Sequence, residues 1–225
     1  IALNIWRIAS YRKRVVDDLH DPTRAFGFFT FIAATNVVSA MFVGIGLELP
    51  AAVLLAAAIA AWVVMGYSIP WLAVLSNPRR PILEAANGTW FIWVVASQSI
   101  AVVAAGIEPL YPEARQWLAI IAVTTWSMGV MLYAMCGLLL LFRLIMYRLE
   151  PQQLDPPYWI TMGAMAITVV AGARIVEMDD APMIDVTRAL IAGLSVIFWA
   201  FATWLIPALL AAGVWRHVVK RVPLR

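Results

Sequence analysis

The sequence predicts an all-α integral membrane protein, a polytopic helical bundle with six transmembrane helices. Hydrophobic residues make up 64% of the 225 residues, and the mean hydropathy of +0.86 lies far above that of soluble domains. Six apolar stretches are each long enough to cross a hydrocarbon core of about 30 Å. Basic side chains also gather in every second connector between these stretches. Together these observations indicate a chain that crosses the membrane repeatedly.

Each span follows from the length of its apolar run. About 20 residues of helix are needed to cross the membrane, and tryptophan and tyrosine near the ends of the runs mark the headgroup zone. We therefore expect a single transmembrane domain over residues 1–225, with spans at about 25–45, 50–75, 89–107, 117–143, 158–176 and 189–214.

The distribution of charge predicts the orientation. Thirteen of the sixteen Lys and Arg residues lie in alternate connectors, and such basic loops stay on the cytoplasmic side of a membrane. We expect a multi-pass protein of a bacterial inner (plasma) membrane, with these residues in the cytoplasm: Arg7, Arg12, Lys13, Arg14, Arg24, Arg79, Arg80, Arg143, Arg148, Arg216, Lys220, Arg221 and Arg225. The intervening connectors, expected outside, hold Glu48, Glu108, Glu113, Arg115, Arg174, Glu177, Asp179, Asp180, Asp185 and Arg188.

Both ends of the sequence predict a fragment. Ile1–Ile8 (IALNIWRI) resembles the tail of an apolar helix that enters a basic loop, whereas a signal peptide places its charge before its apolar core. Lys220–Arg225 (KRVPLR) is a basic connector without a polar tail. We expect the first and last helices of the whole protein to be missing from this chain.

Composition excludes several kinds of site. Cys136, the one cysteine, lies in the fourth span, so no thiolate metal cluster can form. His20 and His217 lie in connectors, which excludes a pair of haem ligands inside the bundle. Lys13 and Lys220, the two lysines, also lie outside the spans, which excludes a buried Schiff base. We predict no catalytic residue, no metal, no cofactor and no enzyme activity. The scattered basic residues also argue against a nucleic-acid site.

Neutral polar residues inside the spans are candidates for lining a pore. Gln98 needs several hydrogen-bond partners and is costly in lipid, so it should face protein or a water-filled path. Residues of the fifth span recur at helical spacing in a stripe that either lines a narrow path or lets a neighbouring helix approach closely. Hydroxyl groups in helices also often bond to their own backbone. The candidates are Gln98, Thr35, Ser39, Thr161, Thr168 and Gly172.

Three segments carry a resemblance to a known family. They are Asp18–Val43 (DLHDPTRAFGFFTFIAATNVVSAMFV), Asn87–Ala101 (NGTWFIWVVASQSIA) and Asp155–Ala173 (DPPYWITMGAMAITVVAGA). The chain resembles the tellurite-resistance and C4-dicarboxylate transporter (TDT) family, which includes TehA-like proteins and is related to plant slow-type anion channels and fungal malate permeases. The resemblance covers most of the chain, and NGTW with the following Gln98 is its most specific part.

The resemblance implies a pore of ten helices built from five helical hairpins, usually in a homotrimer. Odd-numbered helices would form the pore and even-numbered helices an outer layer, with the six spans here corresponding to family helices 3 to 8. The phenylalanine that occludes the pore in this family lies on the ninth helix, which we expect this chain to lack. Phenylalanines at the start of the first span are interpreted as packing or interfacial residues: Phe26, Phe28, Phe29 and Phe31.

We therefore predict transport of small anions across the membrane, such as a dicarboxylate, a halide, nitrate or a tellurite-like oxyanion, through a central pore lined by odd-numbered helices. Neutral polar groups can replace part of an anion's hydration without trapping it. No carboxylate lies near the midplane of a span, which argues against proton coupling. The expected partners are the lipid bilayer, the small anion and the other chains of a homotrimer. The alternatives are a coupled carrier and a non-conducting structural membrane subunit.

Overall fold

The computed structural model describes residues 10–76, 81–148, 150–154 and 156–221. The segment Ile1–Ile8, interpreted from the sequence as the tail of an apolar helix, lies outside the described residues. So do five charged residues mentioned above: Arg7, Arg79, Arg80, Asp155 and Arg225.

The described residues form helices and connecting turns, with no strand among them. The α-helices are α2 (Arg12–His20), α3 (Thr30–Gly44), α4 (Glu48–Pro70), α5 (Ile92–Ile107), α6 (Arg115–Met146), α7 (Ile160–Val176) and α8 (Pro182–Val214). With the short helical turns that extend them, six helices in the described part of the chain are long and apolar enough to cross a membrane, which confirms the predicted fold class. They cover Ala25–Gly44, Glu48–Leu75, Gly88–Leu110, Pro112–Met146, Pro156–Val176 and Pro182–Val219.

The last helix begins at Pro182, earlier than the start near residue 189 that hydropathy alone predicts. Proline fits the first turn of a helix, where its missing N–H would have no partner, and the nearby Asp185 is favourable at a helix N-terminus. The 33 residues of α8 make it roughly 50 Å long, so it extends well beyond the hydrocarbon core.

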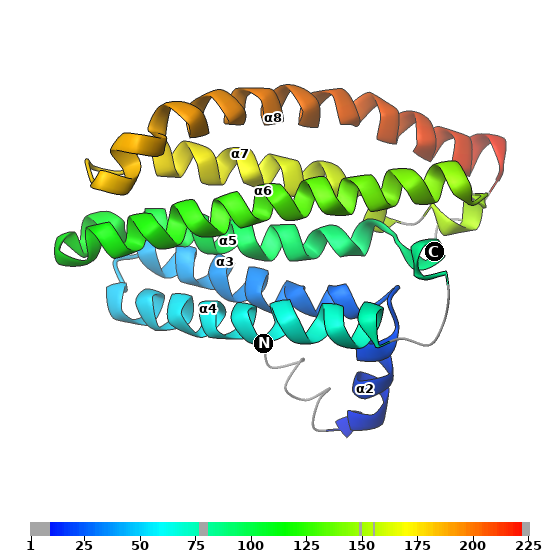
Figure 1. Ribbon diagram of the computed structural model, residues 1–225, viewed down its shortest axis with the longest axis horizontal. Coiled ribbons are helices and arrows are strands. Elements are labelled where there is room, and N and C mark those ends of the chain that lie inside the picture. Colours follow the sequence, from blue (N-terminus) through cyan, green and yellow to red (C-terminus); the bar gives the residue numbers. More distant parts are fainter. Residues whose placement is uncertain (1–9, 77–80, 149, 155, 222–225) are drawn as a thin grey trace.

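The six membrane-crossing helices form three hairpins, α3–α4, α5–α6 and α7–α8 (Figure 1). Helix α5 packs against α3 on one side and against α7 on the other, so the first helices of the three hairpins form an inner row. Helices α4 and α6 also pack on α5, and α6 and α8 pack on α7, so the second helices cover one side of this row. Helix α2 lies outside the bundle at a steep angle to it (Figure 1).

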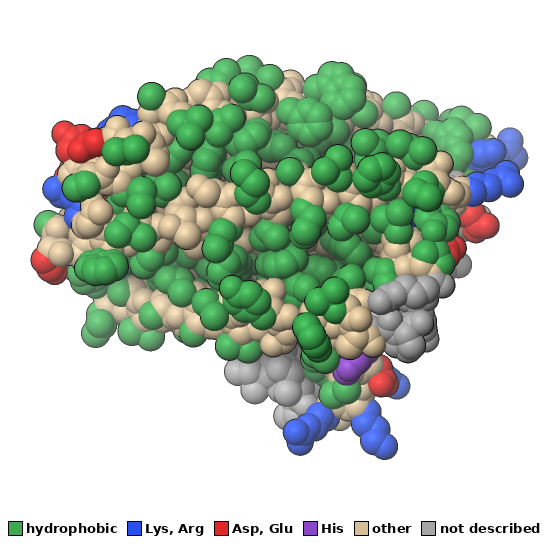
Figure 2. Space-filling view, viewed as in Figure 1, with side chains coloured by type: hydrophobic (Ala, Val, Ile, Leu, Met, Phe, Trp, Pro, Cys, Tyr) green, Lys and Arg blue, Asp and Glu red, His purple; other side chains and the backbone are tan. Residues whose placement is uncertain are grey.

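Burial separates the centre of the bundle from its outer helices. In the 18-residue windows of these spans, 78% of residues are buried in Gly88–Leu110, but only 22% in Pro112–Met146 and 11% in Pro182–Val219. Hydrophobic side chains cover the flank of the molecule, whereas charged side chains lie at its ends and on α2 (Figure 2). An apolar flank of this kind suits contact with lipid, where backbone groups are already paired within helices.

Candidate functional site

Three consecutive polar residues at the middle of α5 each bind a different neighbouring helix. The Trp62 indole N–H on α4 donates to Ser97 Oγ over 2.8 Å. Gln98 Nε2 donates to the carbonyl oxygen of Trp126 on α6 over 3.2 Å, and Asn36 Nδ2 on α3 donates to Ser99 Oγ over 2.9 Å. Successive residues of a helix point about 100° apart, so three in a row reach three neighbours. The polar centre of α5 therefore joins three of the four helices that pack on it, α3, α4 and α6.

Two further hydrogen bonds extend this network to α7 and strengthen the link between α3 and α4. The Trp126 indole N–H donates to the carbonyl oxygen of Thr168 on α7 over 3.0 Å. Ser39 Oγ on α3 donates to the carbonyl oxygen of Ala51 on α4 over 2.8 Å. Bonds of this kind between helices contribute modestly to stability in a membrane, typically below about 2 kcal/mol each. Together they tie α3, α4, α5, α6 and α7 into one unit.

Glycines let the helices approach closely at two points of this network. A Cβ atom at Gly129 on α6 would overlap with the amide of Gln98 on α5. A Cβ atom at Gly172 on α7 would overlap with Ser195 Oγ on α8. Small residues at such crossings are typical of helix packing in membranes. The stripe that contains Gly172 therefore packs against a neighbouring helix at this position.

All six residues predicted to line a pore are buried against protein in the described chain. Three of their hydroxyl groups donate to carbonyl oxygens of the preceding helical turn: Thr35 to Phe31, Thr161 to Tyr158 and Thr168 to Ala164. Of the other three candidates, Ser39 faces α4 and Gln98 faces α6. Gly172 leaves the space into which Ser195 of α8 packs. Their contact with a permeating ion stays a prediction.

The inner row has one face that α4, α6 and α8 do not cover. On α5, three partly exposed residues at i, i+7 and i+11 spacing follow one side of the helix, opposite Trp93. Exposed residues at helical spacing follow α3 and α7 in the same way. We call these residues the open face: Ala34, Val37 and Met41 on α3, Val95, Val102 and Gly106 on α5, and Ala166, Val170 and Ala173 on α7.

The NGTW motif holds the segment that precedes α3. Its Trp90 indole N–H donates to the carbonyl oxygen of Pro22 over 2.8 Å, and Asn87 Nδ2 and Thr89 Oγ1 donate to that of Thr23 over 3.3 and 3.1 Å. Asn87 Oδ1 also accepts from the Thr89 backbone N–H, which starts the helical turn before α5. These bonds fix the beginnings of α3 and α5 against each other.

Gly88, inside the same motif, lies against the segment that precedes α7. A Cβ atom there would overlap with the carbonyl group of Pro157. Short 3₁₀ helices immediately precede α3, α5 and α7, at Ala25–Phe29, Gly88–Phe91 and Pro156–Trp159. The three inner helices thus begin in the same manner, and the turn before α5 contacts the turns before α3 and α7.

Aromatic stacking supports this junction, as expected for packing phenylalanines. The Phe26 ring stacks on Trp90 with centroids 4.8 Å apart, and the Phe29 ring stacks on Trp93 at 5.6 Å. Both phenylalanines are buried. The stacks join the turn before α3 to the start of α5.

A buried arginine ties α6 to the other connectors at this end. Arg143 is 4% exposed; its Nε donates to the carbonyl oxygen of Glu84 over 3.2 Å and its Nη2 to Gln153 Oε1 over 3.1 Å. Glu84 precedes α5 and Gln153 precedes α7. Arg143 therefore links the α6 terminus to the connectors on both sides of its hairpin.

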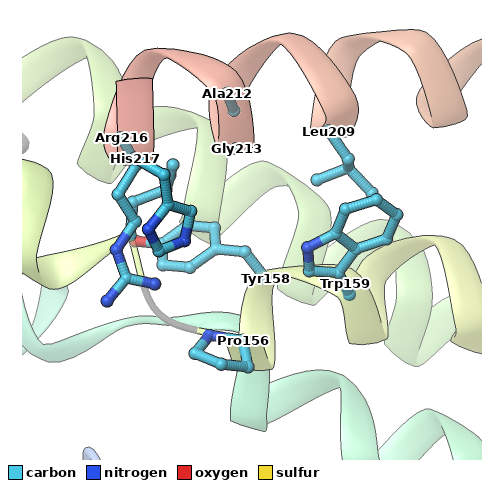
Figure 3. A pocket seen from close by; sticks show the side chains of 9 residues that line it. Pro156, Tyr158, Trp159, Leu209, Ala212, Gly213, Arg216 and His217 are labelled. Atoms are coloured by element: carbon cyan, nitrogen blue, oxygen red, sulfur yellow. The ribbon is translucent and has the colours of Figure 1, made fainter. Parts of the chain in front are cut away.

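A small pocket of about 100 Å³ lies between the start of α7 and the end of α8 (Figure 3). Arg216 and His217 project toward Tyr158 from the helical turn that continues α8, Trp215–Val219, beside the Pro156 segment. The aromatic and basic lining is typical of the zone where a helix bundle meets headgroups and water.

Arginines also organise the opposite end of the bundle. Arg115, at the start of α6, forms ion pairs with the buried carboxylate of Glu108 and, over 2.7 Å, with Asp179 in the α7–α8 connector. Arg188 on α8 donates to the carbonyl oxygen of Val176 over 2.6 Å and to Asp180 over 2.8 Å. The Arg115–Asp179 pair joins the second and third hairpins, whereas the Arg188 contacts close the third hairpin on itself.

The sequence matches the voltage-dependent anion channel family over residues 1–223, nearly its whole length. The chain belongs to the voltage-dependent anion channel family. Two uncharacterized membrane proteins of Mycobacterium tuberculosis, from strains CDC 1551 / Oshkosh and ATCC 25618 / H37Rv, are each 63% identical to it over 94 residues. That match covers 42% of this chain and 48% of each relative, so the aligned part spans about half the length of these curated relatives. No solved structure shows significant similarity.

Membership of the voltage-dependent anion channel family confirms the family that the sequence resembles. The sequence-based candidates nevertheless omitted three residues that organise the centre of this channel-family chain: Asn36, Trp62 and Trp126. Asn36 carries the same signal as Gln98, because a primary amide inside a span needs protein partners. The sequence gives no such signal for Trp62 and Trp126, because an indole ring suits contact with lipid and with protein equally well.

Proposed function

We propose that the whole protein to which this chain belongs transports small anions across the membrane along the open face of α3, α5 and α7. The observation that carries the proposal is the family match over residues 1–223. The substrate class comprises dicarboxylates, halides, nitrate and tellurite-like oxyanions. We further propose a homotrimer in a bacterial inner membrane, with the basic connectors in the cytoplasm.

The chemistry of the open face supports this path. Between Ala34 and Met41, Val95 and Gly106, and Ala166 and Ala173, the sequence contains no charged residue. A fixed cation would bind an anion tightly and slow its exit, and a fixed anion would repel it. The hydroxyl groups and the amide N–H groups of these segments bond to protein, so the path would be bounded mainly by apolar side chains.

The same segments contain no group that titrates near neutral pH. Proton-coupled carriers usually place such groups within the membrane. Their absence from these three stretches of sequence favours passive flux over proton-coupled transport.

A matched pair of glycine substitutions tests the path. In the described part of the chain no neighbouring helix comes within 4 Å of a Cβ atom at Gly106 on the open face or at Gly193 on the outer helix α8. Leucine therefore fits at both positions but narrows the path only at Gly106. Flux of chloride, nitrate and malate would be measured separately in proteoliposomes that contain the whole protein.

We expect Gly106→Leu to lower anion flux at least about tenfold by steric occlusion, with Gly193→Leu unchanged. A third variant, Gln98→Ala, distinguishes a path between helices from a path along the open face. Equal flux in both leucine variants, with loss in Gln98→Ala, would move the path to the interior of the bundle. No flux of any anion in the unmodified protein would favour a coupled carrier or a structural subunit.

A further inference from the structure

A groove separates the outer helices α4 and α6 on the side of the bundle away from the open face. Helices α6 and α8 pack on each other, but α5 forms the floor between α4 and α6. The groove has a volume of about 360 Å³, within the range of ligand sites. Its lining is Trp62, Gly66 and Tyr67 from α4, Trp93 from α5, and Ser127, Met128, Met131 and Leu132 from α6.

The indole N–H of Trp93 has no acceptor among the described residues, although its nitrogen is buried. The other tryptophans that pack inside the bundle do have acceptors: Trp62 binds Ser97, Trp90 binds Pro22 and Trp126 binds Thr168. A buried donor without an acceptor costs free energy, and the membrane interior supplies no water to replace one. An acceptor from outside the chain would remove this cost.

The groove widens beside this donor. A Cβ atom at Gly66 would lie 3.7 Å from Trp93 Nε1, with no other contact within 4 Å among the described residues outside its own helix. The opposite wall is formed by Met128 and Met131, whose unbranched side chains move easily. These thioethers can therefore adjust to a ligand that enters the groove beside Trp93.

The position of the groove fits the ester region of a lipid. Trp93 lies roughly 8 Å along the helix from Gly88, where this membrane span begins. Gly66 and Tyr67 lie in the last turns of α4, at the same end of the bundle. An apolar cleft that begins near the membrane surface admits an acyl chain while leaving its ester near the entrance.

We propose that this groove binds one acyl chain of a membrane glycerolipid, whose ester carbonyl oxygen accepts the hydrogen bond of the Trp93 indole. The apolar walls match the chain, and the unpaired donor matches the ester. The proposal concerns the outward side of the bundle and does not depend on anion transport.

Photolabelling tests the occupant. The whole protein is placed in vesicles that contain phosphatidylglycerol with a diazirine in its acyl chain, and labelled residues are mapped by mass spectrometry. We expect labelling to concentrate on groove residues such as Tyr67 and Met131, above the level on the exposed face of α8. Gly66→Leu fills the groove and should remove most of this excess, whereas Gly193→Leu on α8 should leave it unchanged.

A second matched pair of variants tests the hydrogen bond between the Trp93 indole and the lipid ester. Trp93→Phe keeps an aromatic ring but removes the donor, and should lower groove labelling about threefold, the factor expected for one net hydrogen bond. Trp199→Phe makes the same change at an exposed position on α8 and should have no effect. Unchanged labelling in Trp93→Phe would overturn the hydrogen bond. Uniform labelling of all outward faces would overturn the site. Absence of lipid labelling in the groove, together with crosslinks from the groove to a second copy of the chain, would also overturn it.

Discussion

Helices α5 and α8 are both apolar membrane-crossing helices, yet they occupy opposite environments. Their spans have similar mean hydropathies of 1.8 and 2.1, but 78% of the α5 window is buried and only 11% of the α8 window. Polar side chains in α5 bind three neighbouring helices, whereas the exposed residues of α8 include two tryptophans, Trp199 and Trp204. Hydropathy thus shows that a helix crosses the membrane, and its polar contacts show whether it meets protein or lipid.

The largest expected difference in stability is between substitutions of a glycine just before α5 and of a glycine on α8. Gly88→Ala, at the turn before α5, places a methyl group on the backbone carbonyl of Pro157, which no side-chain rotation can relieve. We expect loss of most folded protein, measured by size exclusion and thermal unfolding in detergent. Gly193→Ala on α8 has open space and should keep or slightly raise stability, by up to about 1 kcal/mol, because alanine favours helix. Equal behaviour of the two variants would contradict the close contact at Gly88.

A smaller difference is expected between two arginines at the acidic end of the bundle. Arg115 pairs with the buried carboxylate of Glu108 beside the end of α5, whereas Arg174 pairs with Glu177 where both side chains are more than half exposed. Arg115→Gln leaves a buried charge unpaired, which is strongly unfavourable, whereas removal of an exposed pair costs little. The apparent melting temperature should fall by several degrees in Arg115→Gln and hardly change in Arg174→Gln. A reversed order would show that Glu108 has another partner.

The hydrogen bond between α3 and α5 gives the next effect. Asn36→Ala removes the donor to Ser99, and we expect a loss of about 1 kcal/mol in the free energy of unfolding. The loss should shrink in a background that already carries Ser99→Ala, because the two changes remove the same bond. The double-mutant cycle is measured by denaturant titration in detergent. Strict additivity of the two changes would show that the bond contributes nothing.

The sequence was sufficient for the fold class and for the number of membrane-crossing helices, because a run of about 20 apolar residues has few alternatives to crossing a membrane. It was not sufficient for the directions of the polar side chains. Ser97, Gln98 and Ser99 together cover most of the circumference of α5, so their order in the chain does not show which neighbour each one meets. The stripe of Thr168 and Gly172 has the same ambiguity, because close packing and pore lining both favour small residues.

Contacts between connectors that are distant in the chain could not be predicted from the sequence either. The resemblance to a transporter family drew attention to NGTW, but its role in binding Pro22 and Thr23 depends on residues more than sixty positions away. Backbone carbonyl oxygens accept these bonds, and every residue has one, so the sequence carries no signal for the pairing. The convergence of three 3₁₀ turns at one end of the bundle became visible only in the fold.

The smallest difference is expected between two threonines with the same local hydrogen bond. Thr168 on α7 donates to Ala164 over 2.8 Å, and Thr203 on α8 donates to Trp199 over 2.9 Å, each four residues earlier. Thr203 is exposed, so Thr203→Ala should leave stability unchanged or raise it slightly, since alanine is the better helix former. Thr168 is 1% exposed, so Thr168→Ala also empties space between packed helices and should cost about 1 kcal/mol in thermal unfolding. Identical values would mean that burial adds nothing to the hydroxyl group's own backbone bond, and that the environments of α7 and α8 differ less than their exposure indicates.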